Sequence, residues 1–347
     1  MKLVAAMAGA KHGGAEAFFE RLVLAFQSAD MEQRAAIRAQ PDRALRLRAA
    51  GVETLELKFG GWLDFRTRPG LRQLLKSFRP GVVLSFMSRA AAAMPTPWGA
   101  VPYIHVGRLG GYYDLKYYST CQHLVGNTED IVRYIREQGW PAQRAHYVPN
   151  FVDGTNTDPE DRALHDTPAD APLLLALGRF HANKGFDTLL RALVDLPDTY
   201  LWLAGDGPEE KALLALAHEL DVLTRTRFLS WRANPAPLFA AADAVVVPSR
   251  KEPLGNVVLE AWARAKPVVA TLSEGPRQLI DTGKNGLLVP VDDAKALAFA
   301  LRHVLDESGL KRDLGEGGFE TFRARFTEEA VLAQYLDLFA RVTGGRR

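Results

Sequence analysis

The sequence predicts an α/β protein with two domains in series, each a parallel sheet with helices on both faces. Its 347 residues are enough for about two domains. Short apolar strands alternate with helical stretches along the chain, which is typical of a doubly wound sheet. The alternation lapses once, in the segment 149–171, which is rich in Pro, Asp, Thr and Gly and marks the predicted boundary.

The first domain, residues 1–155, is predicted from its strands and from the helices between them. These strands are apolar on both faces, as expected for a parallel sheet that helices cover. Helical patterns at 15–26 and 71–78 separate some of them. The predicted strands are 3–6, 52–57, 82–86, 103–106 and 123–126.

The second domain, residues 170–325, repeats this pattern more regularly. Each strand is followed by a turn and mostly by a helix. The last segment, 326–347, contains a helix at 328–341 that has no strand of its own, so we expect it to pack back on the first domain. The predicted strands are 173–177, 200–204, 227–229, 244–247, 267–271 and 286–289.

The amino terminus has two interpretations. A lysine followed by the apolar run 3–10 resembles a secretion signal, but Lys11 ends the run and a helix follows directly, so we interpret it as the first strand. No apolar run reaches the ~18 residues that a membrane-spanning helix needs. The single cysteine, Cys121, cannot form an intrachain disulfide, which fits a reducing compartment.

The charge distribution disfavours one class of partner and suggests another. A net charge of +2 leaves no excess for binding a nucleic-acid backbone. Residues 1–160 nevertheless carry 20 Lys and Arg against 15 Asp and Glu. One basic stretch is either a solvated helix face or a surface for anionic lipid headgroups. It contains Arg66, Arg68, Arg72, Lys76 and Arg79, beside Trp62, Phe65 and Phe78.

Two loops of the second domain carry charged residues where strands are predicted to end, which is where open parallel sheets bind ligands. After strand 173–177, Gly178 permits a turn, and Arg179 and Lys184 put two cations near one strand end. A planar guanidinium and a compact ammonium suit a diphosphate. Two solvated surface cations are the alternative.

The stretch 248–260 is the most informative loop. Gly255 and Asn256 stand where a helix is predicted to begin, so free backbone N–H groups and the helix dipole favour an anion there. Glu252 precedes this point in the loop and Glu260 follows it on the helix. Two carboxylates that hold sugar hydroxyls, beside N–H groups that hold phosphate, form the site of a sugar nucleotide. Chance spacing of two glutamates is the alternative.

The first domain offers fewer signals. Gly9, Gly13 and Gly14 follow the first strand without matching G-x-G-x-x-G, so a nicotinamide or flavin dinucleotide is disfavoured. The loop remains thin enough for a phosphate or sugar to approach. His105, inside strand 103–106, is either a core residue or a ligand-facing group.

Taken together, these motifs resemble the retaining GT-B glycosyltransferases of family 4, also called glycosyltransferase group 1. The matching segments are GRFHANKGFDTLL (178–190), LAGDGPEEKALLALA (203–217), FLSWRANPAPLFAAADAVVVPS (228–249), EPLGNVVLEAWARAKPVVAT (252–271) and LIDTGKNGLLVPVDDAKALAFAL (279–301). Glu252 and Glu260 form the E-x7-E signature of that family. The resemblance implies a GT-B fold, in which two Rossmann-like domains face each other across a cleft.

The resemblance also implies roles for individual residues. It implies that Arg179 and Lys184 bind the donor diphosphate. It also implies that Glu260 binds the ribose and that Glu252 lies beside the donor sugar. The set that it implies as donor-binding is Gly13, Gly14, Gly178, Arg179, Lys184, Trp231, Arg232, Glu252, Gly255, Asn256, Val257 and Glu260. The set that it implies as catalytic is Glu252, Arg179, Lys184 and His105, although Val106 stands where relatives often have Asp after the histidine.

The implied reaction transfers a hexose from a nucleoside diphosphate to a hydroxyl group with retention of configuration. It needs no metal and no other cofactor, and a UDP-sugar is favoured over a GDP-sugar as donor. The expected acceptor is a glycan or glycolipid, as in bacterial lipopolysaccharide synthesis, and the expected location is the cytoplasm or the inner face of the cell membrane. A sugar-nucleotide epimerase of the same fold and an inactive nucleotide-sugar-binding scaffold are the alternatives.

Overall fold

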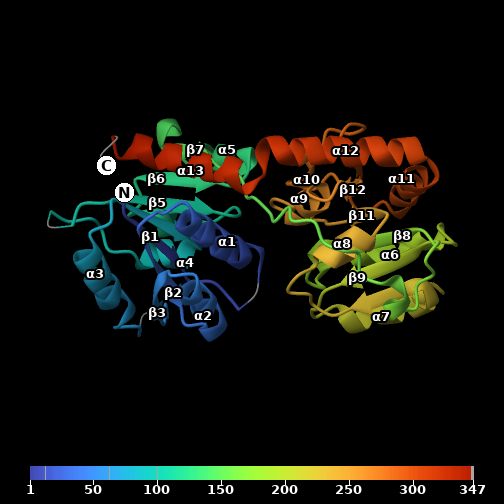
Figure 1. Ribbon diagram of the computed structural model, residues 1–347, viewed down its shortest axis with the longest axis horizontal. Coiled ribbons are helices and arrows are strands. Elements are labelled where there is room, and N and C mark those ends of the chain that lie inside the picture. The colour runs from blue at the N-terminus through green and yellow to red at the C-terminus, as the bar shows by residue number, and fades with distance from the viewer. Residues whose placement is uncertain (12, 62, 100, 345–347) are drawn as a thin grey trace. The chain divides into compact units, whose positions relative to one another are not determined.

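The structure, a computed structural model, describes residues 1–344 except 12, 62 and 100, and it divides into two compact units (Figure 1). The N-terminal unit comprises Met1–Phe151 together with Glu328–Arg347, and the C-terminal unit comprises Val152–Thr327. Each unit is a parallel sheet between helices, so the predicted fold class is confirmed. The chain changes units at 151/152, a few residues before the end predicted for the first domain.

The N-terminal unit has a seven-stranded parallel sheet in the order β3-β2-β1-β4-β5-β6-β7. The chain moves outward from β1 to β3 and returns to β4 on the other side of β1, so the sheet has its topological switch point between β1 and β4. The strands are β1 Leu3–Met7, β2 Gln33–Arg38, β3 Glu53–Leu57, β4 Val82–Phe86, β5 Ile104–Leu109, β6 His123–Gly126 and β7 Ala145–Tyr147.

Two strands of this sheet, β2 and β7, were not predicted from the sequence. The residues of β2 are QRAAIR, whose polar positions hide the strand, and β7 is only three residues long. The strand β5 also extends three residues beyond the predicted 103–106, through Gly107 and Arg108. A charged residue suggested the end of the strand, but this arginine is buried within it.

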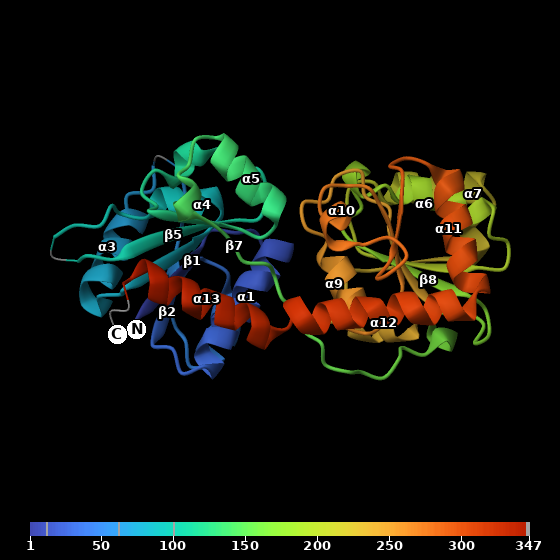
Figure 2. The ribbon, with the colours of Figure 1, turned by 90° about the horizontal axis from the view of Figure 1, so that it is seen from above.

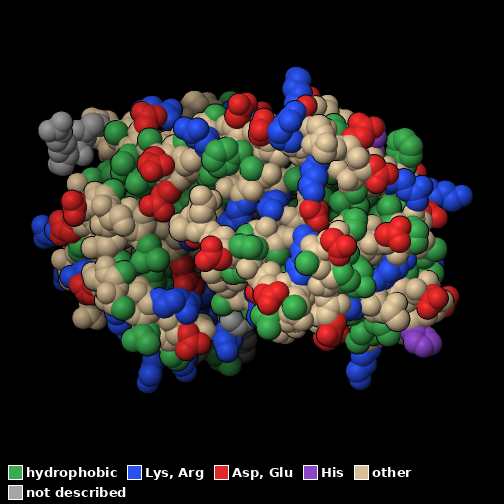
Figure 3. Space-filling view, turned by 45° about the vertical axis from the view of Figure 1, so that its right-hand side comes forward, with side chains coloured by type: hydrophobic (Ala, Val, Ile, Leu, Met, Phe, Trp, Pro, Cys, Tyr) green, Lys and Arg blue, Asp and Glu red, His purple; other side chains and the backbone are tan. Residues whose placement is uncertain are grey.

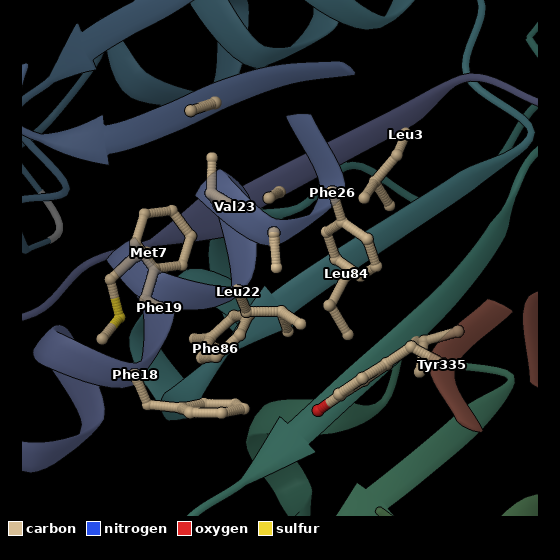
Figure 4. Close-up of a cluster of buried hydrophobic side chains, with 14 of the residues drawn as sticks. Leu3, Met7, Phe18, Phe19, Leu22, Val23, Phe26, Leu84, Phe86 and Tyr335 are labelled. Atoms are coloured by element: carbon tan, nitrogen blue, oxygen red, sulfur yellow. The ribbon is translucent and has the colours of Figure 1, made fainter. Parts of the chain in front are cut away.

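Helices cover both faces of this sheet with separate apolar cores. On one face, α1 and α2 pack with α13 over β1, β2 and β4, and on the other α3 and α4 pack over the same strands. Figure 4 shows the first of these cores, with Phe18, Phe19 and Phe26 of α1 against Leu84 and Phe86 of β4. The helices are α1 Gly14–Ser28, α2 Pro41–Ala49, α3 Thr67–Phe78, α4 Met87–Ala93, α5 Glu129–Glu137 and α13 Glu328–Val342, with 3₁₀ turns η1 Leu115–Tyr118 and η2 Ala142–Arg144.

The helix α13 belongs to the core of the N-terminal unit although it comes last in the chain. It packs against α1 (Figures 1 and 2), and its Tyr335 ring meets Phe26 of α1 edge to face at a centroid distance of 5.9 Å. The Tyr335 side chain reaches into the cluster (Figure 4) and its hydroxyl accepts a hydrogen bond from Nε of Arg108 at 3.0 Å. Arg108 is 2% exposed, lies over the Phe18 ring and also donates to Asn150.

The C-terminal unit has a six-stranded parallel sheet in the order β10-β9-β8-β11-β12-β13, with its switch point between β8 and β11. All of these strands were predicted within one residue of their observed ends. The strands are β8 Leu173–Leu177, β9 Tyr200–Ala204, β10 Thr226–Leu229, β11 Ala244–Val247, β12 Val268–Thr271 and β13 Leu287–Val289.

Two apolar cores also flank this second sheet. One involves α8, α9, α10 and the end of α12, and the other involves α6, α7 and α11. Buried Trp262 donates its indole N–H to the carbonyl of Asn285 at 2.7 Å, so its polar atom is satisfied. The helices are α6 Phe186–Val194, α7 Glu210–Glu219, α8 Ala236–Ala241, α9 Asn256–Trp262, α10 Pro276–Leu279, α11 Ala294–Asp306 and α12 Ser308–Arg325, with 3₁₀ turns η3 Arg162–His165, η4 Ala182–Lys184 and η5 Leu223–Arg225.

No described helix is long and apolar enough to cross a membrane. The face of the molecule in Figure 3 shows acidic and basic side chains interspersed with hydrophobic ones, and neither sign of charge takes over that face. This mixture is what a water-exposed surface usually carries.

Candidate active site

The switch point of the C-terminal unit brings together the two loops that the sequence singled out. The strands β8 and β11 are hydrogen-bonded neighbours, so the loops after them, 178–185 and 248–255, leave the same edge of the sheet side by side. Gly185 makes this approach possible. Its φ is +63°, and a Cβ there would lie 2.1 Å from the carbonyl oxygen of Pro248. Only glycine fits at this contact.

Lys184 and Glu252 form an ion pair across these two loops. Both side chains are largely buried, with 24% and 13% of their surface exposed. The hydroxyl of Ser249 donates to the same carboxylate at 3.3 Å, and the backbone N–H of Glu252 donates to the Glu274 carboxylate at 3.2 Å. A cation and an anion are therefore held together at the point where a ligand with both phosphate and hydroxyl groups can engage each of them.

Arg179 stands apart from this network. Its side chain is exposed, and it has no ion pair with any residue that the structure describes. It follows Gly178, whose φ of +146° turns the chain at the end of β8. Its guanidinium is therefore available to an anionic ligand beside Lys184.

Arg250 is a residue of this site that the sequence analysis missed. It forms ion pairs with Asp187 at 2.7 Å and Asp292 at 2.6 Å, and its side chain also donates to the carbonyl of Ala182. These bonds tie the loop after β11 to the loop after β8. No sequence motif marks such a positioning residue, because its partners, here Asp187 and Asp292, are far from it in the sequence.

The helix α9 begins directly after these loops. Gly255 precedes it with a φ of +87°, and the first residues of the helix are Asn256 and Val257. Glu260 is one turn further along α9, and its carbonyl oxygen accepts a hydrogen bond from the Arg264 side chain at 3.1 Å. The N–H groups at the start of α9 and the carboxylate of Glu260 thus come from one short helix at the sheet edge.

Trp231 and Arg232 follow β10 at this edge of the sheet. The Trp231 side chain is 45% exposed. Arg232 instead forms an ion pair with Glu160 at 3.1 Å, which holds its guanidinium in a structural contact.

The switch point of the N-terminal unit contains a cavity of about 1160 Å³. It is lined by residues at or just after the carboxyl ends of β1, β2, β3 and β4, including Gly9, Arg38, Phe59 and Met87. Met87 has a φ of +64°, the left-handed conformation that side chains other than glycine rarely adopt. The cavity therefore lies where an open α/β sheet is expected to bind a ligand.

Gly13 and Gly14 lie at the start of α1, next to this cavity wall. Gly13 precedes the helix without a capping side chain, and Gly14 is its first residue. Glu16 supplies the contact that orders the loop, because its carboxylate accepts the backbone N–H of Ala10 at 2.7 Å. A Cβ on Gly13 would lie 2.3 Å from that carboxylate, so the loop is thin at this point.

The structure contradicts a ligand-facing position for His105. It is the second residue of β5, at the amino end of the strand, whereas the cavity lies at the carboxyl ends. Its side chain is 0% exposed, and its ring nitrogens bond the hydroxyls of Ser85 at 2.8 Å and Thr120 at 3.1 Å. Burial lowers the pKa of His105 to about 4, so it is neutral at pH 7. In this structure His105 is therefore a buried side chain with both ring nitrogens hydrogen-bonded.

The basic stretch 66–79 does not form a single surface. Arg68 and Arg72 of α3 line the cavity, together with Phe65, whereas Lys76 and Arg79 do not. Phe78 is buried against the sheet, and Trp62 lies outside the described residues. Arg38 and Arg89 complete a set of four cavity arginines. These two could not be placed in a site from the sequence, because one ends the unpredicted strand β2 and the other belongs to the short helix α4.

Solved structures with this fold are GT-B glycosyltransferases. Anabaena HepE in complex with UDP and glucose matches with a TM-score of 0.83 at 19% identity, over 98% of this chain and 99% of that one. WaaG, a glycosyltransferase involved in lipopolysaccharide biosynthesis, matches with a TM-score of 0.72 at 18% identity, over 99% and 100%. At these identities the likeness defines the class of fold, two Rossmann-like units of the GT-B type.

Sequence relatives define the family within that class. Residues 157–321 match the family model described as glycosyl transferases group 1. Two lipopolysaccharide core biosynthesis glycosyltransferases of Rhizobium meliloti strain 1021, LpsE and LpsD, are 39% and 38% identical to this chain. The alignments cover 95% of this chain in both cases, and 96% and 95% of those proteins. The chain therefore belongs to the group 1 glycosyltransferases, as its motifs predicted.

Proposed function

We propose that this glycosyltransferase is a retaining, metal-independent hexosyltransferase of family 4. It takes a hexose from a UDP-sugar and transfers it to a hydroxyl group in the synthesis of a lipopolysaccharide core or another surface glycan. The observation that carries the proposal is the ion pair of Lys184 with Glu252 at the switch point, with the exposed Arg179 on the same loop as Lys184. The names of LpsE and LpsD support the glycan, and the UDP bound by HepE supports the nucleotide.

The donor is held by complementary groups of the C-terminal unit. Arg179 and Lys184 bind the diphosphate, with backbone N–H groups of Gly255, Asn256 and Val257 beside them. In a second group of contacts, Glu260 accepts hydrogen bonds from the ribose hydroxyls and Trp231 stacks on the uracil ring. The ion pair of Arg232 with Glu160 argues for Trp231 rather than Arg232 as the base contact.

The transfer itself forms one bond and breaks one. The acceptor oxygen bonds to the anomeric carbon on the face from which the diphosphate departs, and the bond between that carbon and the diphosphate oxygen breaks. The departing diphosphate takes the acceptor proton. Lys184 and Arg179 stabilise the charge that grows on the diphosphate, which is electrostatic catalysis by positioned cations. Glu252 orients the donor sugar and keeps Lys184 in place.

The acceptor belongs to the N-terminal unit, whose cavity is large enough for a sugar chain. We place the enzyme in the cytoplasm or on the inner face of the membrane, where it meets a glycan or glycolipid precursor. The single cysteine, Cys121, is buried, which is compatible with a reducing compartment.

The two glutamates offer the sharpest test of the donor site. Glu260→Gln should weaken UDP and UDP-sugar alike, because both contain the ribose. Glu252→Gln should lower turnover and leave UDP binding nearly unchanged. Calorimetric titration with UDP and steady-state kinetics separate the two effects, and Glu219→Gln, on the exposed face of α7, is the matched control. The reverse pattern would mean that the two roles are exchanged.

Product analysis tests the reaction class. Proton NMR of the product should show that the anomeric configuration of the donor is retained. Release of labelled sugar from the donor should require an acceptor. Release of epimerised sugar without acceptor would instead identify an epimerase, and binding without any turnover would identify a scaffold.

A further inference from the structure

We propose that the cavity of the N-terminal unit binds an anionic sugar, carrying a phosphate or a carboxylate, as part of the acceptor. This inference rests on the proposed glycosyltransferase function and adds the chemical class of the acceptor. Its binding groups are four arginines that line the cavity, Arg38, Arg68, Arg72 and Arg89.

These arginines come from separate elements and converge on one space. Arg38 ends β2, Arg89 lies in α4, and Arg68 and Arg72 are four residues apart on α3, so these two share a helix face. Each guanidinium offers a planar fork that matches a phosphate or carboxylate. A neutral glycan does not require several arginines in its binding site, so these residues favour an anionic ligand.

None of the four forms an ion pair with a residue that the structure describes; Arg68 donates to the carbonyl oxygen of Ala92 at 3.2 Å. Arginines elsewhere on β2 and α2 behave differently. Arg34 pairs with Glu53, Arg43 and Arg46 both pair with Glu20, and Arg48 pairs with Glu56. These arginines of β2 and α2 therefore have acidic partners, whereas the four cavity arginines form no ion pair with a described residue.

The two acids of the cavity, Glu16 and Asp64, are already engaged by their own loops. Glu16 accepts the N–H of Ala10. Asp64 accepts the Thr67 hydroxyl, the N–H of Gly60 at 2.7 Å and the N–H of Thr67 at 3.1 Å. The Thr67 hydroxyl and these N–H groups lower the pKa of Asp64 to about 2, so it stays an anion that orders the loop. The four arginines outnumber these two acids, so the cavity keeps a net positive charge for a ligand.

The rest of the cavity lining fits a sugar. Phe65 is 77% exposed, and Tyr113 and Tyr117 add rings with polar tips. Aromatic faces cover the C–H face of a pyranose, and hydroxyls and guanidinium groups engage its rim. At about 1160 Å³ the cavity exceeds the ~300–1,000 Å³ typical of small-ligand sites, so it has room for more than one sugar unit.

The test compares three probes on matched variants. Glucose 6-phosphate and glucuronic acid carry the anion, and glucose is the neutral match. We expect the two anionic sugars to stabilise the wild-type protein against heat and to give measurable calorimetric affinities, both weakened by added salt, whereas glucose has little effect. No stabilisation by glucose 6-phosphate, or equal effects of glucose 6-phosphate and glucose, would overturn the proposal.

The variants are Arg72→Gln and Arg89→Gln, with Lys76→Gln as control, because Lys76 is an exposed cation of α3 outside the cavity. We expect Arg72→Gln and Arg89→Gln each to weaken glucose 6-phosphate about tenfold or more, as expected for the loss of a charge-assisted bond. Lys76→Gln should leave its affinity unchanged. If Lys76→Gln weakens binding as much as Arg72→Gln, the effect is one of general surface charge and the proposal fails.

Vesicles distinguish a lipid headgroup from a sugar anion. With phosphatidylglycerol vesicles, a cavity for a sugar anion predicts that glucose 6-phosphate does not compete with vesicle binding and that Arg72→Gln and Lys76→Gln do not differ. Competition, or a selective loss with Arg72→Gln, would assign the arginines to the headgroup instead. UDP affinity, measured on the same variants, should stay at the wild-type value. If the wild-type protein does not bind UDP, the proposed donor site is refuted, whereas the proposal for this cavity is unaffected.

Discussion

The switch points of the two units share one topology and differ in how their charges are balanced. In the C-terminal unit, Lys184 is paired with Glu252, and Arg250 with Asp187 and Asp292. In the N-terminal unit the cavity arginines are unpaired, and the acids beside them bond their own backbone. One fold therefore supports a preorganised site with internal ion pairs and an open cationic one. The difference lies in loop residues rather than in the sheets.

The largest expected effect tests which segments complete each unit. Tyr335→Ala should destabilise the N-terminal unit by about 3–5 kcal/mol, because it removes a buried ring and the partner of Arg108. Hydrogen exchange of the amides of β1 and β4 measures the loss. Asp337→Ala, on the exposed side of α13, should change it by less than about 0.5 kcal/mol.

The comparison would break if Tyr335→Ala lowered the protection of β8 and left β1 unchanged. Tyr335→Phe is an intermediate case. It keeps the ring and leaves Nε of Arg108 without its acceptor, and we expect it to cost about 1–3 kcal/mol.

The next effect concerns the close approach of loops in the C-terminal unit. Gly185→Val should reduce kcat/KM roughly 100-fold, because the loop that carries Lys184 is pushed away from Pro248. Steady-state kinetics with UDP-sugar measure it. Gly309→Ala, in the exposed start of α12 where a Cβ meets nothing within 4 Å, is the control and should keep full activity. Equal activity of both variants would show that the two loops need not meet.

A pH effect is expected from the core of the N-terminal unit. His105 takes up a proton near pH 6.5 in the unfolded chain and only near 4 in the folded unit. Between these values the unfolded chain binds more protons, so stability falls as the pH falls. From about pH 7.5 to about pH 5 the loss from this group is about 2 kcal/mol.

The loss of stability is measured by chemical denaturation at several pH values across this range, with hydrogen exchange of the β4 amides as the readout. His105→Gln should flatten the profile between pH 6.5 and 4. His146, whose pKa is lowered to about 4 by burial and by the neighbouring His123, should leave a residual slope in this variant. An unchanged profile in His105→Gln would assign the pH dependence to other groups.

The smallest effect separates the two donor cations. Arg179→Ala and Lys184→Ala should each weaken UDP binding about tenfold or more, since charge-assisted bonds are worth about 1.5–3 kcal/mol. Lys184→Ala should also lower stability slightly, because Glu252 loses its ion pair, whereas Arg179→Ala should not. Calorimetry and thermal unfolding report the two quantities. Wild-type UDP affinity in both variants would remove the donor site from this loop.

The two loops of the candidate donor site could be located from the sequence because each follows a strand with a clear apolar pattern. Loops that follow apolar runs such as β8 and β11 are easy to find, and a switch point then brings them together. Arg250 escaped because its role depends on Asp187 and Asp292, which only the fold makes its neighbours.

The cavity of the N-terminal unit could not be predicted for physical reasons that are visible in its strands. The strand β2 contains two arginines, and Arg38 stands at its end, so a polar pattern concealed both the strand and the residue. Arg108 made β5 appear to end early, although two aromatic rings and two hydrogen bonds compensate for its burial. His105 seemed to stand near the carboxyl end of its strand because the predicted strand 103–106 stopped three residues short of Leu109.

The return of the chain to its first unit has a consequence for biosynthesis. On the ribosome, residues 1–151 emerge first, yet the core that they build includes Val331, Tyr335, Leu338 and Phe339, which emerge last. The continuous segment 152–327 can fold while it is being translated, whereas the nascent first unit must wait with the binding surface for α13 exposed. Until then that surface is a natural target for chaperones, and a message truncated before codon 328 would yield one finished unit and one incomplete unit.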